Sequence, residues 1–209
     1  EKVAKLLGAN PDEIIFTAGA TESTNFIIKG YLDYRKFYGD GKNHVITSLV
    51  EHKATLNTCK YLNGELYSNN DPTTSLFGVK KKVDRGYEAS FVGVNPDGEI
   101  SVEEITSAIK ENTALVSMIY VNNEIGTISD VESVAEICNK NNIALHSDLT
   151  QALGKIEIDV KRMGIDYASC SAHKIYGPKG IGAAFMKSDA YGIVPITAFM
   201  HGGEQEFGF

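Results

Sequence analysis

The chain has 209 residues and a mass of 22.7 kDa, which is enough for one large domain with a sizeable hydrophobic core. Its net charge of −7 and its pI near 5.3 argue against nucleic acid or an anionic membrane surface as the main partner. No apolar run approaches the roughly 18 residues that a membrane-spanning helix needs.

Strand-like and helix-like patterns alternate along the chain. After a helix end at residues 1–8, the predicted strands are 14–17, 44–48, 114–120, 143–146, 166–169 and 181–186. The predicted helices are 20–38, 53–62, 101–109 and 131–140. This alternation predicts an α/β fold in which helices cover both faces of a mostly parallel sheet. Ligands of such sheets gather at the carboxyl ends of the strands.

Residues 63–95 interrupt this alternation. The stretch is polar and contains Lys80-Lys81-Lys82, so we expect an exposed insertion whose lysines form a solvated surface. A docking patch for an acidic partner is the alternative interpretation of the lysine run.

The three cysteines, Cys59, Cys138 and Cys170, are odd in number and widely spaced. This pattern argues against a disulfide framework and favours a reducing compartment. No cysteine or histidine pair is followed by the second pair that a structural zinc site needs, so no metal site is predicted.

Lys174 and Asp148 suggest a specific cofactor. A lysine amine can form a Schiff base with an aldehyde, and a carboxylate can hold a pyridine nitrogen protonated. Asp148 follows a buried strand, where an acidic side chain needs a cationic partner or strong hydrogen-bond donors. Together the two residues predict pyridoxal 5'-phosphate (PLP) chemistry. The alternative for Asp148 is a cap on the next helix.

A phosphate site is predicted at the turn before the helix 20–38. Gly19 allows a tight turn, the helix N-terminus presents backbone amides at Ala20 and Thr21, and Thr21 adds a hydroxyl group. Ser171 and His173, beside Lys174, can complete the cage. The alternatives are an ordinary strand–helix turn and a polar loop.

Three further polar residues follow predicted strands. His52 has a flat imidazole that can stack on a pyridine ring and move a proton, although it can also simply begin a helix. Asn123 follows Asn122, and two adjacent amides are costly to bury without partners, so we expect a ligand contact or an Asn-rich turn. Gln151, three residues after Asp148, can bind the phenolic oxygen of the cofactor.

Five sequence words occur in one order along the chain. They are Gly19-Ala20-Thr21-Glu22-Ser23, Thr47-Ser48 with Glu51-His52-Lys53, Val121-Asn122-Asn123-Glu124-Ile125-Gly126, Asp148 with Thr150-Gln151, and Ser171-Ala172-His173-Lys174-Ile175-Tyr176-Gly177-Pro178-Lys179-Gly180. Together they resemble the cysteine desulfurases of the NifS/IscS type, within the class V aminotransferase group. Outside residues 63–95 the resemblance covers nearly the whole chain, and it is closer to the IscS-like branch than to the SufS-like branch.

The resemblance implies the large domain of a PLP-dependent transferase of fold type I, with a site built from matching residues. Lys174 would hold the cofactor covalently and move the Cα proton, and His52 would stack on the ring and act in acid–base steps. Asp148 would pair with the pyridine nitrogen, and Gln151 with the phenolic oxygen. Asn123 would lie near the substrate carboxylate. The phosphate would be held by Ala20, Thr21, Ser171 and His173.

The resemblance also implies a reaction and partners. L-cysteine would become L-alanine, with the sulfur left as an enzyme persulfide and passed to an iron–sulfur scaffold protein. The full-length enzyme would be a homodimer. Alternatives are another class V enzyme, such as a selenocysteine lyase or an aminotransferase, or a non-catalytic domain that retains the fold.

Residues 1–209 read as a large domain truncated at both ends. The resemblance places the small C-terminal domain and the sulfur-accepting cysteine beyond Phe209, so we expect the fragment alone to be inactive. The long polar insertion and the Asn-, Lys- and Tyr-rich texture favour a eukaryotic source and a mitochondrion or a related organelle. A bacterial source would place the protein in the cytoplasm.

Overall fold

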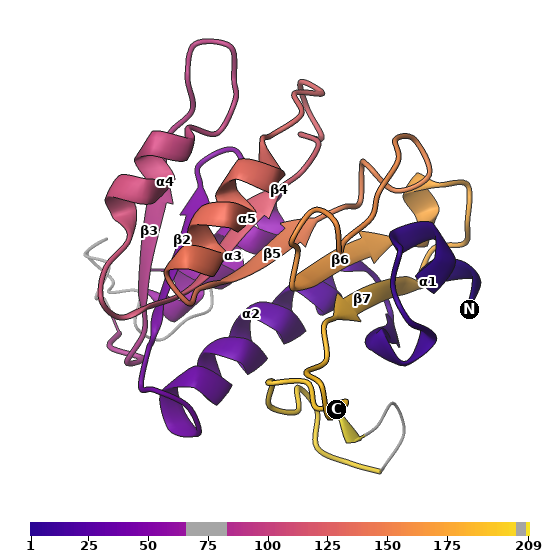
Figure 1. Cartoon of the computed structure of the whole chain (residues 1–209), viewed down its shortest axis with the longest axis horizontal. Helices are drawn as coiled ribbons and strands as arrows, with labels where there is room; N and C mark the ends of the chain where they lie inside the picture. Colours follow the sequence, from indigo (N-terminus) through magenta and orange to yellow (C-terminus); the bar gives the residue numbers. More distant parts are fainter. Residues whose placement is uncertain (66–82, 204–207) are drawn as a thin grey trace, which may run out of the picture.

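The computed structural model describes residues 1–65, 83–203 and 208–209. They contain one seven-stranded sheet with the strand order β1-β7-β6-β5-β4-β2-β3 (Figure 1). The strands are β1 (Ile14–Thr17), β2 (His44–Ser48), β3 (Glu88–Val92), β4 (Thr113–Ile119), β5 (Ala144–Asp148), β6 (Tyr167–Ser171) and β7 (Gly182–Met186). The five strands from β6 to β3 in this order are parallel, whereas β7 pairs antiparallel with β6 and with β1. The predicted α/β fold with a mostly parallel sheet is confirmed.

Helices cover both faces of the sheet, as expected. They are α1 (Lys2–Leu7), α2 (Ala20–Phe37), α3 (Lys53–Leu62), α4 (Val102–Ala108) and α5 (Val131–Lys140), with short 3-10 turns η1 (Pro11–Glu13) and η2 (Ala172–Lys174). Side chains of α2 and α3 belong to one buried cluster, and those of α1, α4 and α5 belong to the other. Helices α4 and α5 pack against each other on their face of the sheet (Figure 1).

The central strands have short apolar runs because both of their faces are covered. Every residue of β2, β4, β5, β6 and β7 is buried. Side chains of successive residues pack on opposite faces of the sheet. Ala144 and Ala184 belong to the buried cluster on the α2 side, whereas Leu145 and Phe185 belong to the cluster on the α5 side. This alternation follows from the two-residue period of a strand.

The direction of the connections changes between β2 and β4. The chain leaves β2 for α3 on one face of the sheet, and it leaves β4 for α5 on the other face. The carboxyl ends of these neighbouring strands therefore border a crevice, which is where open α/β sheets bind ligands.

The predicted insertion at residues 63–95 was wrong for residues 88–92. They form β3, which pairs in parallel with β2 from His44 opposite Glu88 to Ser48 opposite Val92. As an edge strand, β3 is only partly buried and includes polar residues, so its sequence contains no apolar run that would predict a strand. The centre of the insertion, including Lys80-Lys81-Lys82, lies outside the described residues.

All three cysteines are buried and free, which agrees with the expected absence of a disulfide framework. Within residues 1–65, 83–203 and 208–209, no helix combines the length and apolar character that crossing a bilayer requires.

Candidate active site

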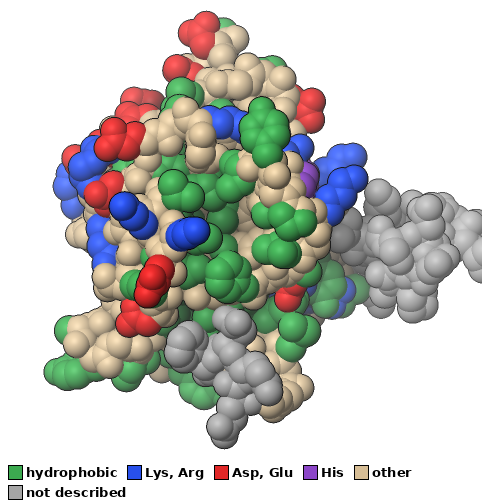
Figure 2. Space-filling model, turned by 90° about the vertical axis from the view of Figure 1, so that its right-hand side faces the viewer, with side chains coloured by type: hydrophobic (Ala, Val, Ile, Leu, Met, Phe, Trp, Pro, Cys, Tyr) green, Lys and Arg blue, Asp and Glu red, His purple; other side chains and the backbone are tan. Residues whose placement is uncertain are grey.

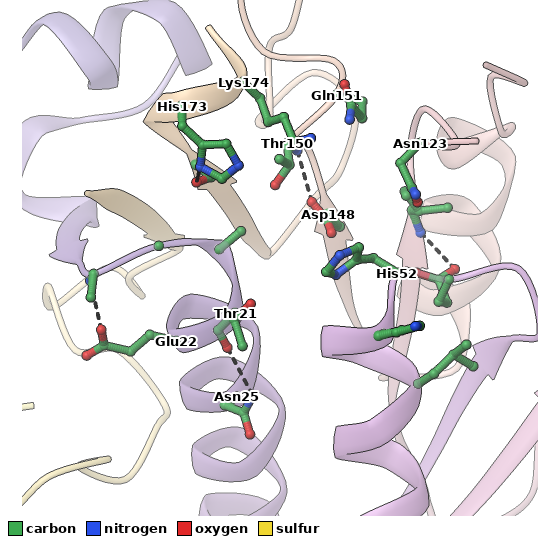
Figure 3. A pocket seen from close by; sticks show the side chains of 18 of the residues that line it. Thr21, Glu22, Asn25, His52, Asn123, Asp148, Thr150, Gln151, His173 and Lys174 are labelled. Atoms are coloured by element: carbon green, nitrogen blue, oxygen red, sulfur yellow. Dashed lines mark hydrogen bonds between the residues drawn. The ribbon is translucent and has the colours of Figure 1, made fainter. Parts of the chain in front are cut away.

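An open cavity of about 1170 Å³ lies at the carboxyl edge of the sheet (Figure 3). All of the predicted site residues line it: Ala20, Thr21, His52, Asn123, Asp148, Gln151, Ser171, His173 and Lys174. They come from segments up to about 150 positions apart in the chain, and the ends of β2, β4, β5 and β6 bring them together. Convergence of polar groups in one cavity is the usual form of a small-molecule site.

Asp148 is the one acid of the predicted set, and it is buried. It ends β5 with an exposed fraction of 3%, and its Oδ1 accepts a hydrogen bond of 2.9 Å from the backbone amide of Thr150. Burial raises the pKa of the Asp148 carboxyl, while Thr150 and the nearby His52 oppose the shift. No lysine or arginine of the described segments forms an ion pair with it. A cationic group of a ligand would satisfy this carboxylate.

The capping alternative for Asp148 is also partly realised. The hydrogen bond to Thr150 closes a local turn, but no α-helix is described between β5 and β6. The Asp148 side chain still lines the cavity.

Lys174 enters the same cavity from the end of β6. It is the last residue of η2, and Figure 3 shows its side chain extending over the space that Asp148 faces. A Cβ atom on Gly177 would lie 2.9 Å from the carbonyl oxygen of Ala172, so the turn that carries Lys174 can close only around a glycine. Lys53 and Lys179 also line the cavity and provide internal comparisons for Lys174.

The N-terminus of α2 forms one wall of the cavity. Gly19 has φ 156°, and the amide of Ala18 donates to the Glu22 carboxylate at 2.7 Å. For the amides of Ala20 and Thr21, no acceptor is recorded within the described segments. An 18-residue helix that begins with free amides is suited to a phosphate group.

Ser171 and His173 lie against this wall from the other side. The Ser171 hydroxyl and Nδ1 of His173 are 2.8 Å apart, and a Cβ atom on Gly19 would lie 3.9 Å from the Ser171 Oγ atom. The predicted phosphate-binding residues therefore surround one space, with donors from both α2 and β6.

His52 is the N-cap of α3. Its Nδ1 accepts a hydrogen bond of 3.1 Å from the amide of Ala54, so the proton of the neutral ring is carried by Nε2. In Figure 3 the ring lies beside Asp148 and is exposed to the cavity. The helix-start interpretation and the ligand-contact interpretation are thus compatible, because capping uses only one ring nitrogen.

Comparison with known proteins identifies the family. The family model described as "Aminotransferase class-V" matches residues 1–206. The chain belongs to the class V aminotransferase family.

Similar class V proteins include named cysteine desulfurases. The chain is 43% identical over 206 residues to the cysteine desulfurase IscS of Rickettsia typhi, covering 99% of this chain and 44% of the relative. A structure titled "SspA in complex with cysteine" matches with a TM-score of 0.82 and 38% identity, covering 99% of this chain and 52% of the other. A NifS-like protein matches with a TM-score of 0.82, 39% identity and coverage of 99% and 50%. The chain thus spans about half the length of these relatives, and the predicted resemblance to the NifS/IscS type is confirmed.

Class V enzymes are generally PLP-dependent, and the residues present fit this cofactor. The buried Asp148 has no cationic partner in the described structure, Lys174 provides an amine, and the first turn of α2 provides unpaired amides. These are the chemical groups that a pyridinium nitrogen, an aldehyde and a phosphate require.

The adjacent residues Asn122 and Asn123 have different surroundings. Asn122 is buried and holds its own turn, because its side chain donates to Val50 O and accepts from the amides of Glu124 and Ile125. Asn123 lines the cavity. The turn interpretation thus describes Asn122, and a ligand contact stays a prediction for Asn123.

Gln151 has its side-chain amide oriented by a lysine. Nζ of Lys155 donates to Gln151 Oε1 at 2.8 Å and to the Gln151 backbone carbonyl at 3.1 Å. This leaves the Gln151 Nε2 group as a donor on a residue that lines the cavity. A donor is the group required to bind a phenolic oxygen.

Glu51 also lines the cavity, although the sequence alone gave no role for this residue. Its exposed fraction is 5%, and its Oε1 accepts from the Ser48 hydroxyl at 2.7 Å and from the Ile119 amide at 2.9 Å. An acidic residue placed between a buried strand and His52 was the available signal, because such a position is costly unless the group is hydrogen-bonded.

Proposed function

We propose that this chain is the cofactor-binding part of a longer PLP-dependent cysteine desulfurase. The observation that supports this most strongly is the cavity in which Lys174, the buried Asp148 and the N-terminus of α2 converge. The similarity to IscS and NifS-like proteins supports desulfurase chemistry in particular. On this proposal residues 1–209 are one domain, and a smaller domain and the sulfur-accepting cysteine lie elsewhere in the protein.

Each wall of the cavity has a separate task in this proposal. When bound, PLP supplies an electron sink for the bonds of an attached amino acid. The free amides of Ala20 and Thr21, with Ser171 and His173, bind the phosphate group. The Asp148 carboxylate, which forms no ion pair with a lysine or arginine of the described residues, holds the pyridine nitrogen protonated.

Lys174 and His52 perform the proton transfers. The Lys174 amine reaches over the cavity, where it can take up and release the proton of a substrate Cα atom once it is not itself bonded to the cofactor. His52 carries its mobile proton on Nε2, since Nδ1 is occupied by the Ala54 amide. The exposed side of its ring covers one side of the cavity, which is the place for a stacking contact.

The substrate and the sulfur acceptor belong to the same proposal. L-cysteine is the substrate, L-alanine is the product, and the sulfur leaves as an enzyme persulfide for an iron–sulfur scaffold protein. Asn123, at the cavity wall after β4, would contact the substrate carboxylate. We place the protein in a mitochondrion or related organelle for a eukaryotic source, and in the cytoplasm for a bacterial one.

The proposal includes a homodimer. Hydrophobic side chains gather on one face of the molecule, with charged side chains around them (Figure 2). Phe16, Tyr176 and Ile181, which belong to the segments around β1 and β7 beside the cavity, are exposed apolar residues. Large exposed apolar areas are typical of protein interfaces.

Product analysis of the full-length protein tests the proposed reaction. Incubation with PLP and L-cysteine should give alanine in an amount equal to the sulfide released with a thiol reductant. With a keto acid present as amino acceptor, formation of 3-mercaptopyruvate would indicate an aminotransferase instead, and turnover of L-selenocysteine alone would indicate a selenocysteine lyase. Absence of any product would favour a non-catalytic protein.

A further inference from the structure

Glu51 lies at the point where the sheet opens into the cavity. It follows β2, whose chain turns to α3 on one face, and it contacts β4, whose chain turns to α5 on the other face. Its Oε1 atom accepts hydrogen bonds from Ser48, the last residue of β2, and from the amide of Ile119, the last residue of β4. One carboxyl oxygen thus joins two strand ends that border the crevice.

The second oxygen of this carboxyl group has a different environment. Oε2 of Glu51 is buried and has no hydrogen-bond partner in the described structure. No lysine or arginine of the described segments forms an ion pair with the residue. An ionised carboxylate with one unsatisfied buried oxygen would be costly, whereas a protonated one needs no cation.

The titratable groups that act on Glu51 also favour its neutral form. Asp148 approaches from β5, and its negative charge opposes ionisation of Glu51, whereas the hydrogen bonds from Ser48 and Ile119 favour the ionised form. The Cys59 thiol of α3 also lies near Glu51 and stays neutral, because burial raises the pKa of Cys59. Burial is the largest effect, and burial and Asp148 together outweigh the two hydrogen bonds and raise the pKa of the Glu51 carboxyl to about 8. Asp148 differs because His52 acts to lower the pKa of the Asp148 carboxyl.

We propose that Glu51 is a positioning residue that keeps a proton on Oε2 and ties the ends of β2 and β4 together through Oε1. The tie fixes the first turn after β2, and therefore His52, beside Asp148. The neutral form leaves Asp148 as the negative charge that faces the ligand. The consequence for PLP rests on the proposed function, but the proton and the tie are properties of the chain alone.

Infrared spectroscopy of the cofactor-free chain tests the proton. The difference spectrum between wild type and Glu51→Gln should contain the carbonyl stretch of a protonated carboxylic acid, and this band should fade as the pH rises through about 8. A carboxylate band in its place at neutral pH would overturn the neutral assignment.

Amide hydrogen exchange tests the tie. In wild type and Glu51→Gln the Ile119 amide should exchange slowly, because both side chains offer an acceptor oxygen. In Glu51→Met, which has similar length and no acceptor, exchange at Ile119 should accelerate by about tenfold or more while distant strand amides such as that of Phe185 do not change. Equal protection in all three proteins would overturn the tie. If Glu51→Met fails to fold, slow exchange at Ile119 in Glu51→Gln keeps the proposal, and fast exchange there overturns it.

Cofactor binding separates this inference from the proposed function. The PLP dissociation constant of Glu51→Gln should stay within about twofold of wild type, and that of Glu51→Met should rise by about tenfold. A loss in Glu51→Gln as large as in Glu51→Met would show that the charge, not the tie, matters. If wild type does not bind PLP, the proposed function fails, while the infrared and exchange results still decide the state of Glu51.

Discussion

Gly182 of β7 packs against Gly19 so closely that a Cβ atom at position 182 would lie 2.5 Å from the Gly19 Cα atom and 2.7 Å from the Cys170 carbonyl oxygen. This contact brings the turn before α2 against the end of β6. The amides of α2 and the Ser171 hydroxyl can therefore surround one ligand group only because residue 182 has no side chain.

Replacing Gly182 with alanine should disturb both stability and phosphate binding. The clash is with backbone atoms, which cannot move aside cheaply, so we expect the free energy of unfolding to fall by about 1–3 kcal/mol. PLP affinity should also decrease. Gly202→Ala is the matched control, because its Cβ atom would meet nothing within 4 Å. Denaturant unfolding and cofactor titration measure both effects, and an unchanged Gly182→Ala protein would contradict this role of the contact.

Asp148→Asn should separate stability from function. The asparagine keeps the acceptor for the Thr150 amide but removes a buried charge that has no cationic partner in the described structure. Because the folded state raises the pKa of Asp148, ionisation at neutral pH costs stability, so the cofactor-free variant should be more stable by on the order of 1 kcal/mol.

PLP affinity should change in the opposite direction. Asp148→Asn should bind the cofactor about tenfold or more weakly, since a neutral amide cannot hold a pyridinium charge. Asp12→Asn, at an exposed acid in η1, is the control and should change neither quantity appreciably. Unchanged PLP affinity in Asp148→Asn would remove the predicted role of this residue.

Lys155 should affect the cofactor without touching it. Lys155→Met frees the Gln151 amide to rotate, and the cost of ordering it again predicts a rise of about two- to tenfold in the PLP dissociation constant. Stability should change by less than about 0.5 kcal/mol, because Lys155 is exposed. Lys140→Met, at an exposed lysine that pairs with Glu136, serves as the control. Equal affinities in the two variants would show that Lys155 does not position Gln151.

Acid should destabilise the protein through His146. This side chain is fully buried, hydrogen-bonded to Ser117 and Ser169, and burial lowers its pKa from 6.5 to about 3. Between these two pH values the unfolded chain binds a proton at His146 and the folded chain does not. The stability that the neutral His146 contributes is therefore fully present above pH 6.5 and is lost as the pH falls toward about 3.

The slope from this one group approaches about 1.4 kcal/mol per pH unit. Chemical unfolding at a series of pH values measures it. His146→Gln should have a shallower acid slope, whereas His173→Gln, at an exposed histidine, should keep the wild-type slope. Parallel slopes for wild type and His146→Gln would show that His146 does not titrate in this way.

The central elements of the fold could be predicted because both faces of their strands are covered. Strands β4 and β5 are buried throughout and contain short apolar runs, and the helix between them has a regular apolar stripe. Edge strands gave weaker signals. Strand β3 pairs with a single strand, β2, and it mixes polar and apolar residues and is only partly buried. Residues 88–92 were therefore predicted to belong to a polar insertion. The antiparallel pairing of β1 with β7 also depends on contacts across more than 160 positions, which no local pattern reveals.

The site divides in the same way. The chemistry of the site could be predicted from residue types at Lys174, at Asp148 and at the Gly19 turn. The family resemblance added specific roles for individual residues, and these roles stay predictions. Lys155 and Glu51 were missed as positioning residues because their importance comes from partners distant in space or from burial. The split between Asn122 and Asn123 likewise required coordinates, since adjacent identical side chains face different surroundings.

Covalent attachment of the cofactor is the direct test of whether Lys174 forms the Schiff base. The chain should be incubated with PLP, reduced with borohydride and digested, and the labelled peptides identified by mass spectrometry. Lys53 and Lys179 line the same cavity and serve as internal controls. We expect one reduced adduct, on Lys174, that is lost in Lys174→Ala and retained in Lys179→Ala. An adduct on Lys53 or Lys179 with none on Lys174, or no adduct on any of the three lysines, would contradict this role of Lys174.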